Sequence, residues 1–132
     1  MSDLATNMRF SGADSYIRAA LTGLASRQRA IANNVANVDT PNFKASEVRF
    51  EDALKGAITR RQGSGPSQSS LNSLASRSSL EDGTTTRADG NNVDIDREME
   101  LLGESQLTYS ALTQVMSSRL GILRSVVSGG GR

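Results

Sequence analysis

The stretch that decides the fold is residues 94–128, which read DIDREMELLGESQLTYSALTQVMSSRLGILRSVVS. Apolar side chains recur there every three or four positions, which predicts one long helix with a heptad stripe. At 1.5 Å per residue such a helix is about 50 Å long, more than the width of a 14 kDa globule. We therefore expect a rod-like helix that needs a partner along its length. The stripe consists of Ile95, Met99, Leu102, Gln106, Tyr109, Thr113, Met116, Leu120, Leu123 and Val127.

A second apolar row lies beside this stripe and is concentrated towards the C-terminus. Acidic residues crowd the first turns of the predicted helix and basic residues its end, as the helix dipole favours. Three glycines, Gly129 to Gly131, end the pattern. No partner for the second row is evident within the chain, so neighbouring molecules are expected to cover it. The row includes Leu112, Val115, Ile122 and Val126.

The N-terminal part of the chain carries the same spacing. Ser11 and Asp14 resemble a capping box, many alanines raise helix propensity, and Pro41 stops the pattern, so a helix is predicted from about Gly12 to Ala36. Pairing of the two apolar stripes would form an intrachain coiled coil. The N-terminal stripe consists of Ile17, Leu21, Leu24, Gln28, Ile31, Val35 and Val38.

The fold class expected is therefore all-α. Residues 1–38 would form an N-terminal segment with the first coiled-coil helix, and residues 93–132 the second. Between them, residues 39–61 would form a turn, a short extended piece and a short helix, because alternating apolar residues give way there to helical spacing. Residues 62–92 are rich in Ser and Gly, which predicts a flexible linker arm or a loop ordered by its neighbours.

The composition removes most catalytic chemistry. Cys and His are absent, which excludes thiol nucleophiles, imidazole bases and thiolate or imidazole metal sites. The acidic group around Asp94 fails the calcium-loop pattern and is explained by the helix dipole. We expect no catalytic residues, no metal and no cofactor. The formal net charge of +1 gives no reason to expect nucleic acid as a partner, and neither a small-molecule substrate nor a membrane-spanning or cleaved signal segment is indicated.

One segment resists a purely structural explanation. Residues 32–44 read ANNVANVDTPNFK, and asparagine is a poor helix former. One Asn would be a frayed helix end, but three within five residues, beside a Pro and an aromatic ring, suggest a specific recognition corner. Its candidate contact residues are Asn33, Asn34, Asn37, Thr40, Pro41 and Phe43.

This segment resembles the signature of the flagellar axial proteins, the rod and hook family. A second segment, Asp89 to Met99 continuing to Tyr109, is similar to the one that opens the C-terminal helix in proximal rod members. Asn42 departs from the family pattern because Gly is usual there, and the linker has no counterpart that can be identified.

The resemblance implies a non-enzymatic structural subunit of the periplasm-spanning basal-body rod. It implies packed terminal helices that line the export channel and transmit torque, and export by the flagellar type III apparatus without a cleaved signal. The implied neighbours are further copies of the chain, FlgC-like and FlgF-like rod subunits and the adaptor FliE. The corner and stripe residues, namely Ile17, Leu21, Leu24, Ile31, Val35, Met99, Leu102, Leu112, Met116, Leu120 and Leu123 beside those of residues 32–44, would form the subunit interfaces.

Two other classes of function stay open at this point. A cytoplasmic coiled-coil adaptor or export chaperone would show the same heptads without a reason for the corner. An enzyme that uses only Asp and Glu would need a cleft, which so small a core hardly provides. The thin apolar content also predicts that the isolated chain is largely unfolded and becomes helical on assembly.

Overall fold

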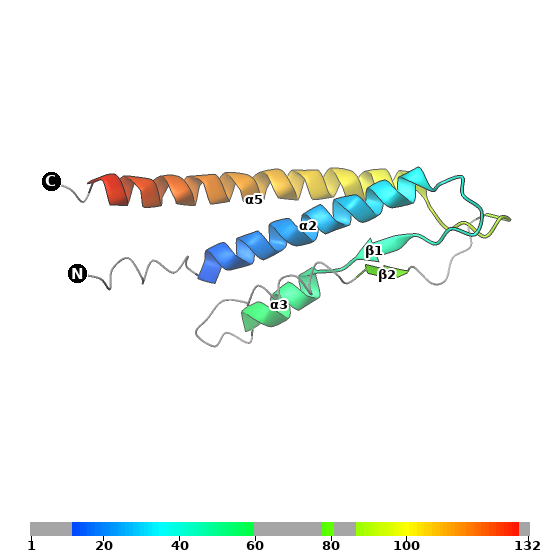
Figure 1. The fold of residues 1–132 in the computed structure, drawn as a ribbon, viewed down its shortest axis with the longest axis horizontal. Helices are drawn as coiled ribbons and strands as arrows, with labels where there is room; N and C mark the ends of the chain where they lie inside the picture. The colour runs from blue at the N-terminus through cyan, green and yellow to red at the C-terminus, as the bar shows by residue number, and fades with distance from the viewer. Residues whose placement is uncertain (1–11, 60–77, 81–86, 130–132) are drawn as a thin grey trace.

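The computed structural model describes residues 12–59, 78–80 and 87–129. Its elements are helix α2 (Gly12–Ala36), strand β1 (Ser46–Val48), helix α3 (Glu51–Thr59), strand β2 (Ser78–Leu80) and helix α5 (Ile95–Gly129). Helices α2 and α5 run antiparallel, so the start of α2 and the end of α5 lie at the same end of the molecule (Figure 1). The predicted pair of long terminal helices is confirmed.

Helix α5 begins where a side chain satisfies its first backbone N–H groups. The Asp94 carboxylate accepts hydrogen bonds from the backbone N–H groups of Asp96, at 3.1 Å, and Arg97, at 3.3 Å. Asp94 is therefore the N-cap, and Asp96 and Glu98 place further negative charge at the positive end of the helix dipole.

The face that α5 turns towards α2 differs from the expected one. Its buried residues are Glu98 and Ser105, and the same heptad row continues through Leu112 and Arg119, which are half-buried. Only part of the predicted stripe, Leu102 and Met116, lies half-buried, whereas the rest is exposed. A row that includes Glu98, Ser105 and Arg119 faces inward, with Leu102 and Met116 beside it. The exposed stripe residues are Ile95, Met99, Gln106, Tyr109, Thr113, Leu120, Leu123 and Val127.

A small apolar core joins α2 to the segment that follows it. Ala20, Leu24, Val48 and Phe50 form the buried cluster, and Leu112 of α5 packs against it. Leu112 was expected to find no partner within the chain, and that expectation is wrong. The Phe50 ring lies over Gly23, where an added Cβ would meet the ring at 2.4 Å, so the glycine makes the notch in α2 that receives the ring.

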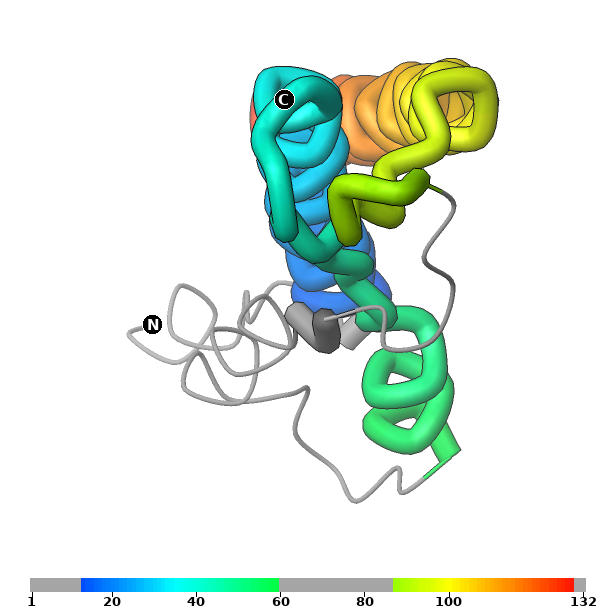
Figure 2. The backbone as a smooth tube through the Cα atoms, turned by 90° about the vertical axis from the view of Figure 1, so that its right-hand side faces the viewer, coloured from blue at the N-terminus to red at the C-terminus, as the bar shows by residue number. Residues whose placement is uncertain are grey.

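The segment between the long helices contains an extended piece and a short helix, β1 and α3, as predicted. Strand β1 pairs antiparallel with β2, with Glu47 opposite Ser79. Figure 2 shows β1, β2 and α3 gathered beside α2. Most of the predicted flexible arm, like Ser11 of the predicted capping box, lies outside the described residues. The end of the arm, residues 87–92, instead belongs to the ordered turn before α5.

Candidate assembly site

The Asn-rich segment that follows α2 and the segment that leads into α5 meet at one end of the helical hairpin. We call this region the corner and define it as residues 33–46, at the end of α2, and residues 87–98, at the start of α5. Asn91 lies at its centre and has no exposed surface. The Asn91 side-chain amide donates hydrogen bonds to three backbone carbonyls in the turn after α2, those of residues 37, 38 and 40, at 2.9 to 3.0 Å. A residue from the second segment thus satisfies carbonyls of the turn that follows α2.

Asn34 joins three elements in the same way. The Asn34 side-chain oxygen accepts from the backbone N–H of Ser46 at 2.9 Å, and its nitrogen donates to the Ser46 carbonyl at 3.0 Å. The same nitrogen donates to Glu98 Oε1 at 2.8 Å. Both Asn34 and Glu98 are buried. One amide therefore pairs with β1 as a neighbouring strand would and also binds the first turn of α5.

The backbone of the corner needs two left-handed residues. Asn42 has φ 60° and Gly90 has φ 80°. The Asn42 N–H donates to the Asp89 carbonyl at 2.9 Å, and a Cβ added to Gly90 would meet Asn42 Oδ1 at 2.7 Å, so the two left-handed residues lie against each other. Asn tolerates this conformation better than other residues with a side chain, which explains why it can stand where Gly is usual.

Polar side chains close the remaining positions of the corner. The Ala45 N–H donates to Asn92 Oδ1 at 2.7 Å, and Lys44 Nζ donates to the Gly90 carbonyl at 2.8 Å. Arg87 donates to the Val38 carbonyl at 2.9 Å. The corner is accordingly a hydrogen-bonded unit made by residues far apart in the chain.

The predicted corner residues divide into two groups. Asn34 is buried, and Asn37 and Phe43 are half-buried. The other three, Asn33, Thr40 and Pro41, are exposed and available to other molecules. Sequence reasoning missed the structural roles of Asn91, Asn92 and Glu98, although the Asn91-Asn92 pair before α5 was a visible signal.

The predicted stripe residues also divide. On α2, Leu24 and Ile31 are buried, and Ile17, Leu21 and Val35 are half-buried. On α5, by contrast, large apolar side chains are exposed on several sides of the helix in the described part of the chain, and we call this set the outward face. It consists of Ile95, Met99, Leu107, Tyr109, Val115, Leu120, Ile122, Leu123, Val126 and Val127.

A second polar pair joins the helices far from the corner. Arg119 Nη1 donates to Asp14 Oδ1 at 2.8 Å, and only 7% of the Asp14 side chain is exposed. The sequence patterns predicted a different role for each residue. Asp14 was expected in a helix cap, and Arg119 is one of the basic residues near the negative end of the α5 dipole. Nothing in the local sequence connects two residues so far apart.

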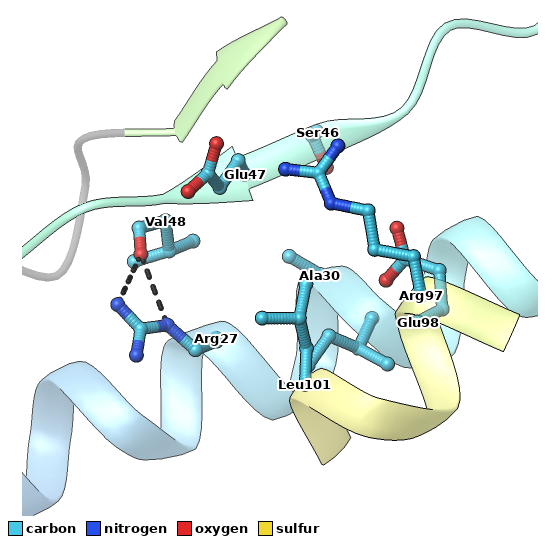
Figure 3. Close-up of a pocket in the computed structure, with 9 residues that line it drawn as sticks. Arg27, Ala30, Ser46, Glu47, Val48, Arg97, Glu98 and Leu101 are labelled. Atoms are coloured by element: carbon cyan, nitrogen blue, oxygen red, sulfur yellow. Dashed lines mark hydrogen bonds between the residues drawn. The ribbon is translucent and has the colours of Figure 1, made fainter. Parts of the chain in front are cut away.

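A small hollow lies where α2, β1 and α5 meet (Figure 3). Arg27 from α2 and Arg97 from α5 both approach β1 there, and Arg27 donates to the Val48 carbonyl at 3.0 and 3.2 Å. The pKa of Glu47 lies below its ordinary value, chiefly because Arg49 donates a hydrogen bond to the carboxylate. The positive charges of Arg97 and Arg27 lower it further, whereas partial burial opposes them.

The hollow has room for about one ordered water and is no substrate cleft. Among the described residues, no group of three acidic side chains is arranged to hold a metal ion. None of the described helices combines the length and the apolar character that crossing a membrane requires.

Comparison with known proteins gives the family. A family model described as flagella basal body rod protein matches residues 18–44, which run from α2 into the corner. The flagellar basal body rod protein FlgB of Bacillus subtilis is 34% identical over 130 residues, covering 92% of this chain and 97% of that protein. FlgB of Borrelia hermsii is 37% identical over 79% of this chain and 87% of that protein, and FlgB of Salmonella typhimurium 31% over 92% and 97%. The match runs along nearly the whole chain at this level of identity, and the chain belongs to the FlgB family of flagellar basal body rod proteins.

Proposed function

We propose that the chain builds the rod as a structural subunit that joins its neighbours through the outward face of α5 and the exposed part of the corner. The observation that carries this proposal is the distribution of exposed apolar side chains. In the described residues every large one except Ile58 lies on α5. So many exposed large apolar side chains on one helix indicate a protein interaction site.

The geometry supports assembly along a common axis. The outward face extends over most of α5, and the part of it that belongs to the predicted stripe keeps heptad spacing, which suits packing against other long helices. At the far end, Ile122 and Val126 are 61% and 63% exposed, where α5 extends past the start of α2 (Figure 1). Neighbouring subunits would supply the burial that the chain itself lacks.

The finer parts of the proposal follow the family resemblance. The neighbours would be further copies of the chain, the FlgC-like and FlgF-like rod subunits and the adaptor FliE. The assembled helices would line the export channel and transmit torque across the periplasm. The chain would reach this place through the flagellar type III export apparatus without losing a signal peptide.

Charged substitutions on the outward face test the assembly role. We expect Leu123→Asp with Val127→Asp to abolish motility and to remove the chain from isolated basal bodies, because two carboxylates cannot be buried unpaired between helices. Ser117→Asp with Ser118→Asp adds the same charge to exposed polar positions of α5 and should assemble. If the first variant assembles as the unchanged chain does, the outward face is not the interface.

Export is tested separately. In cells with a disabled flagellar export apparatus we expect the chain to stay in the cytoplasm, and in intact cells the assembled chain should begin at Met1 or Ser2. A processed N-terminus, or unchanged delivery without the apparatus, would contradict this route. A cytoplasmic location in intact cells would favour the adaptor or chaperone alternative.

A further inference from the structure

The inward row of α5 is the less apolar of two possible choices. In its present orientation α5 directs Glu98, Ser105, Leu112 and Arg119 towards α2. A rotation by about half a residue step, roughly 50°, would instead centre the predicted stripe on α2, with Met99 and Leu120 in place of Glu98 and Arg119. Burial of apolar surface alone would favour the rotated arrangement. Some other interaction must keep the apolar stripe outside.

The two polar pairs can supply that interaction. Near the corner, Glu98 is buried and accepts a hydrogen bond from Asn34 at 2.8 Å. At the other end of the row, the buried Asp14 carboxylate receives Arg119 at 2.8 Å. Rotating α5 would withdraw Glu98 from Asn34 and Arg119 from Asp14. A buried carboxylate that loses its partner is strongly disfavoured, so rotation is opposed at both ends.

We infer that the Asn34–Glu98 and Asp14–Arg119 pairs act together as a rotational lock, which keeps Met99 and Leu120 of the predicted stripe turned away from the chain's own α2. A polar residue in a helix seam commonly selects one arrangement at a cost in stability. Here the selection prevents the chain from burying this part of its outward face. The use of that face in assembly rests on the proposed function, but the lock itself is a property of the single chain.

Cysteine labelling of the full-length chain tests the lock without reference to assembly. The sequence contains no Cys, so an introduced thiol is the sole site for a maleimide. Met99→Cys samples the outward face and Ser105→Cys the inward row. In the purified chain, kept folded with trimethylamine N-oxide, we expect the thiol at position 99 to react at least about tenfold faster than that at 105, since Met99 is 49% exposed and Ser105 only 2%.

The lock is then removed with Asp14→Ala, Glu98→Ala and Arg119→Ala, which leave Asn34 bonded to Ser46. We expect the order of reactivity to invert, with the thiol at 99 slowed by about tenfold and that at 105 accelerated. The matched control, Glu100→Ala, Glu104→Ala and Arg124→Ala, makes the same change in charge at exposed positions of α5 and should keep the original order.

The other outcomes would each overturn the inference. An unchanged order in the variant without the lock would show that other contacts choose the face. Fast labelling at both positions would show that the pairs hold the helices together rather than orient α5, and equal rates in the starting chain would show that no face is selected. Inversion in the control would point to general charge effects. If the triple variant unfolds, the double variant Asp14→Ala with Arg119→Ala is used instead, because it keeps the Asn34–Glu98 pair. The inference then requires that a thiol introduced by Leu120→Cys is labelled more slowly in this double variant than in the chain with both pairs.

Discussion

The corner is held together by buried polar side chains, whereas the last half of α5, residues 113–129, exposes apolar ones. In the corner, buried amides such as Asn34 and Asn91 bind backbone groups from distant segments. In residues 113–129, Ile122, Val126 and Val127 are each more than 60% exposed, and the polar contact to α2 that the structure shows there is the one between Arg119 and Asp14. These amides of the corner thus find their partners within the chain, whereas the apolar side chains at the end of α5 stay exposed for neighbouring molecules.

This difference assigns separate tasks to the two regions. Buried hydrogen bonds are directional, so the corner fixes how the chain reverses between α2 and α5. Apolar burial is not directional, so the outward face can gain stability from any well-shaped helical neighbour. The corner thus defines the turn between the helices, and α5 presents apolar side chains that are exposed in the single chain.

The largest expected effect concerns hydrogen exchange in the free chain. We expect amides of the corner to exchange at least about a hundredfold more slowly than those of residues 113–129, because the corner is buried and hydrogen-bonded within the chain whereas most side chains of residues 113–129 are exposed. Circular dichroism on the dilute chain should show much less helix than the structure contains. In assembled rods both regions should be protected. Uniform protection in the free chain, with a melt independent of concentration, would show a self-sufficient domain.

Replacing the central amide should break the corner. Asn91→Ala removes the donor to three carbonyls, and we expect it to lower the free energy of unfolding by about 3 kcal/mol. The measurement is a urea titration followed by circular dichroism, in the same osmolyte for all variants. Arg87→Ala is the control, because exposed Arg87 reaches the same Val38 carbonyl and should cost less than about 1 kcal/mol. Equal losses would mean that burial of the amide is unimportant.

Much of this contrast was predictable from the sequence, but its contacts were not. Heptad spacing predicted both long helices, and the Asn-rich segment predicted a specific corner. The spacing could not tell which face of α5 turns inward, because Asn34 with Glu98 and Asp14 with Arg119 are polar partners far apart in the chain. By its number of apolar residues, the predicted stripe would be the side of α5 that packs against α2, but most of this stripe is exposed. The assembled rod is where that stripe would be buried.

Two neighbouring asparagines separate folding from recognition within the corner. Asn34→Ala should lower the free energy of unfolding by about 2 kcal/mol, since it leaves buried groups of Ser46 and Glu98 without this partner. Asn33 is exposed, and Asn33→Ala should change stability by less than about 0.5 kcal/mol. If Asn33→Ala nevertheless blocks assembly, Asn33 contacts a neighbour. If the double variant assembles normally, the corner is not a recognition element.

Alanine substitutions at two glycines compare a position on α2 that lies under the Phe50 ring with an exposed position on α5. Gly23→Ala would place a Cβ at 2.4 Å from the Phe50 ring, and we expect a loss of about 1 to 2 kcal/mol as the ring moves. Gly103→Ala meets nothing within 4 Å and should gain up to about 1 kcal/mol through helix propensity. Thermal unfolding of both variants gives the sign directly. A loss at Gly103 would reveal a packing contact on α5 that the structure does not show.

The smallest expected effect is a pH dependence beside the corner, at Glu47 of β1. The pKa of this carboxyl is lowered from 4.5, mainly by the hydrogen bond from Arg49, so the folded chain favours the charged form. A carboxylate with a lowered pKa contributes stability above its unfolded pKa and loses it as the pH falls through the folded value. Because Arg49 is largely exposed, the contribution should stay below about 1 kcal/mol. We expect Glu47→Gln to be slightly less stable than the unchanged chain at pH 7, with the difference vanishing as the pH falls from about 4.5 towards 3. Urea titrations of both chains across this range measure it, and a difference that grows on acidification would contradict the assignment.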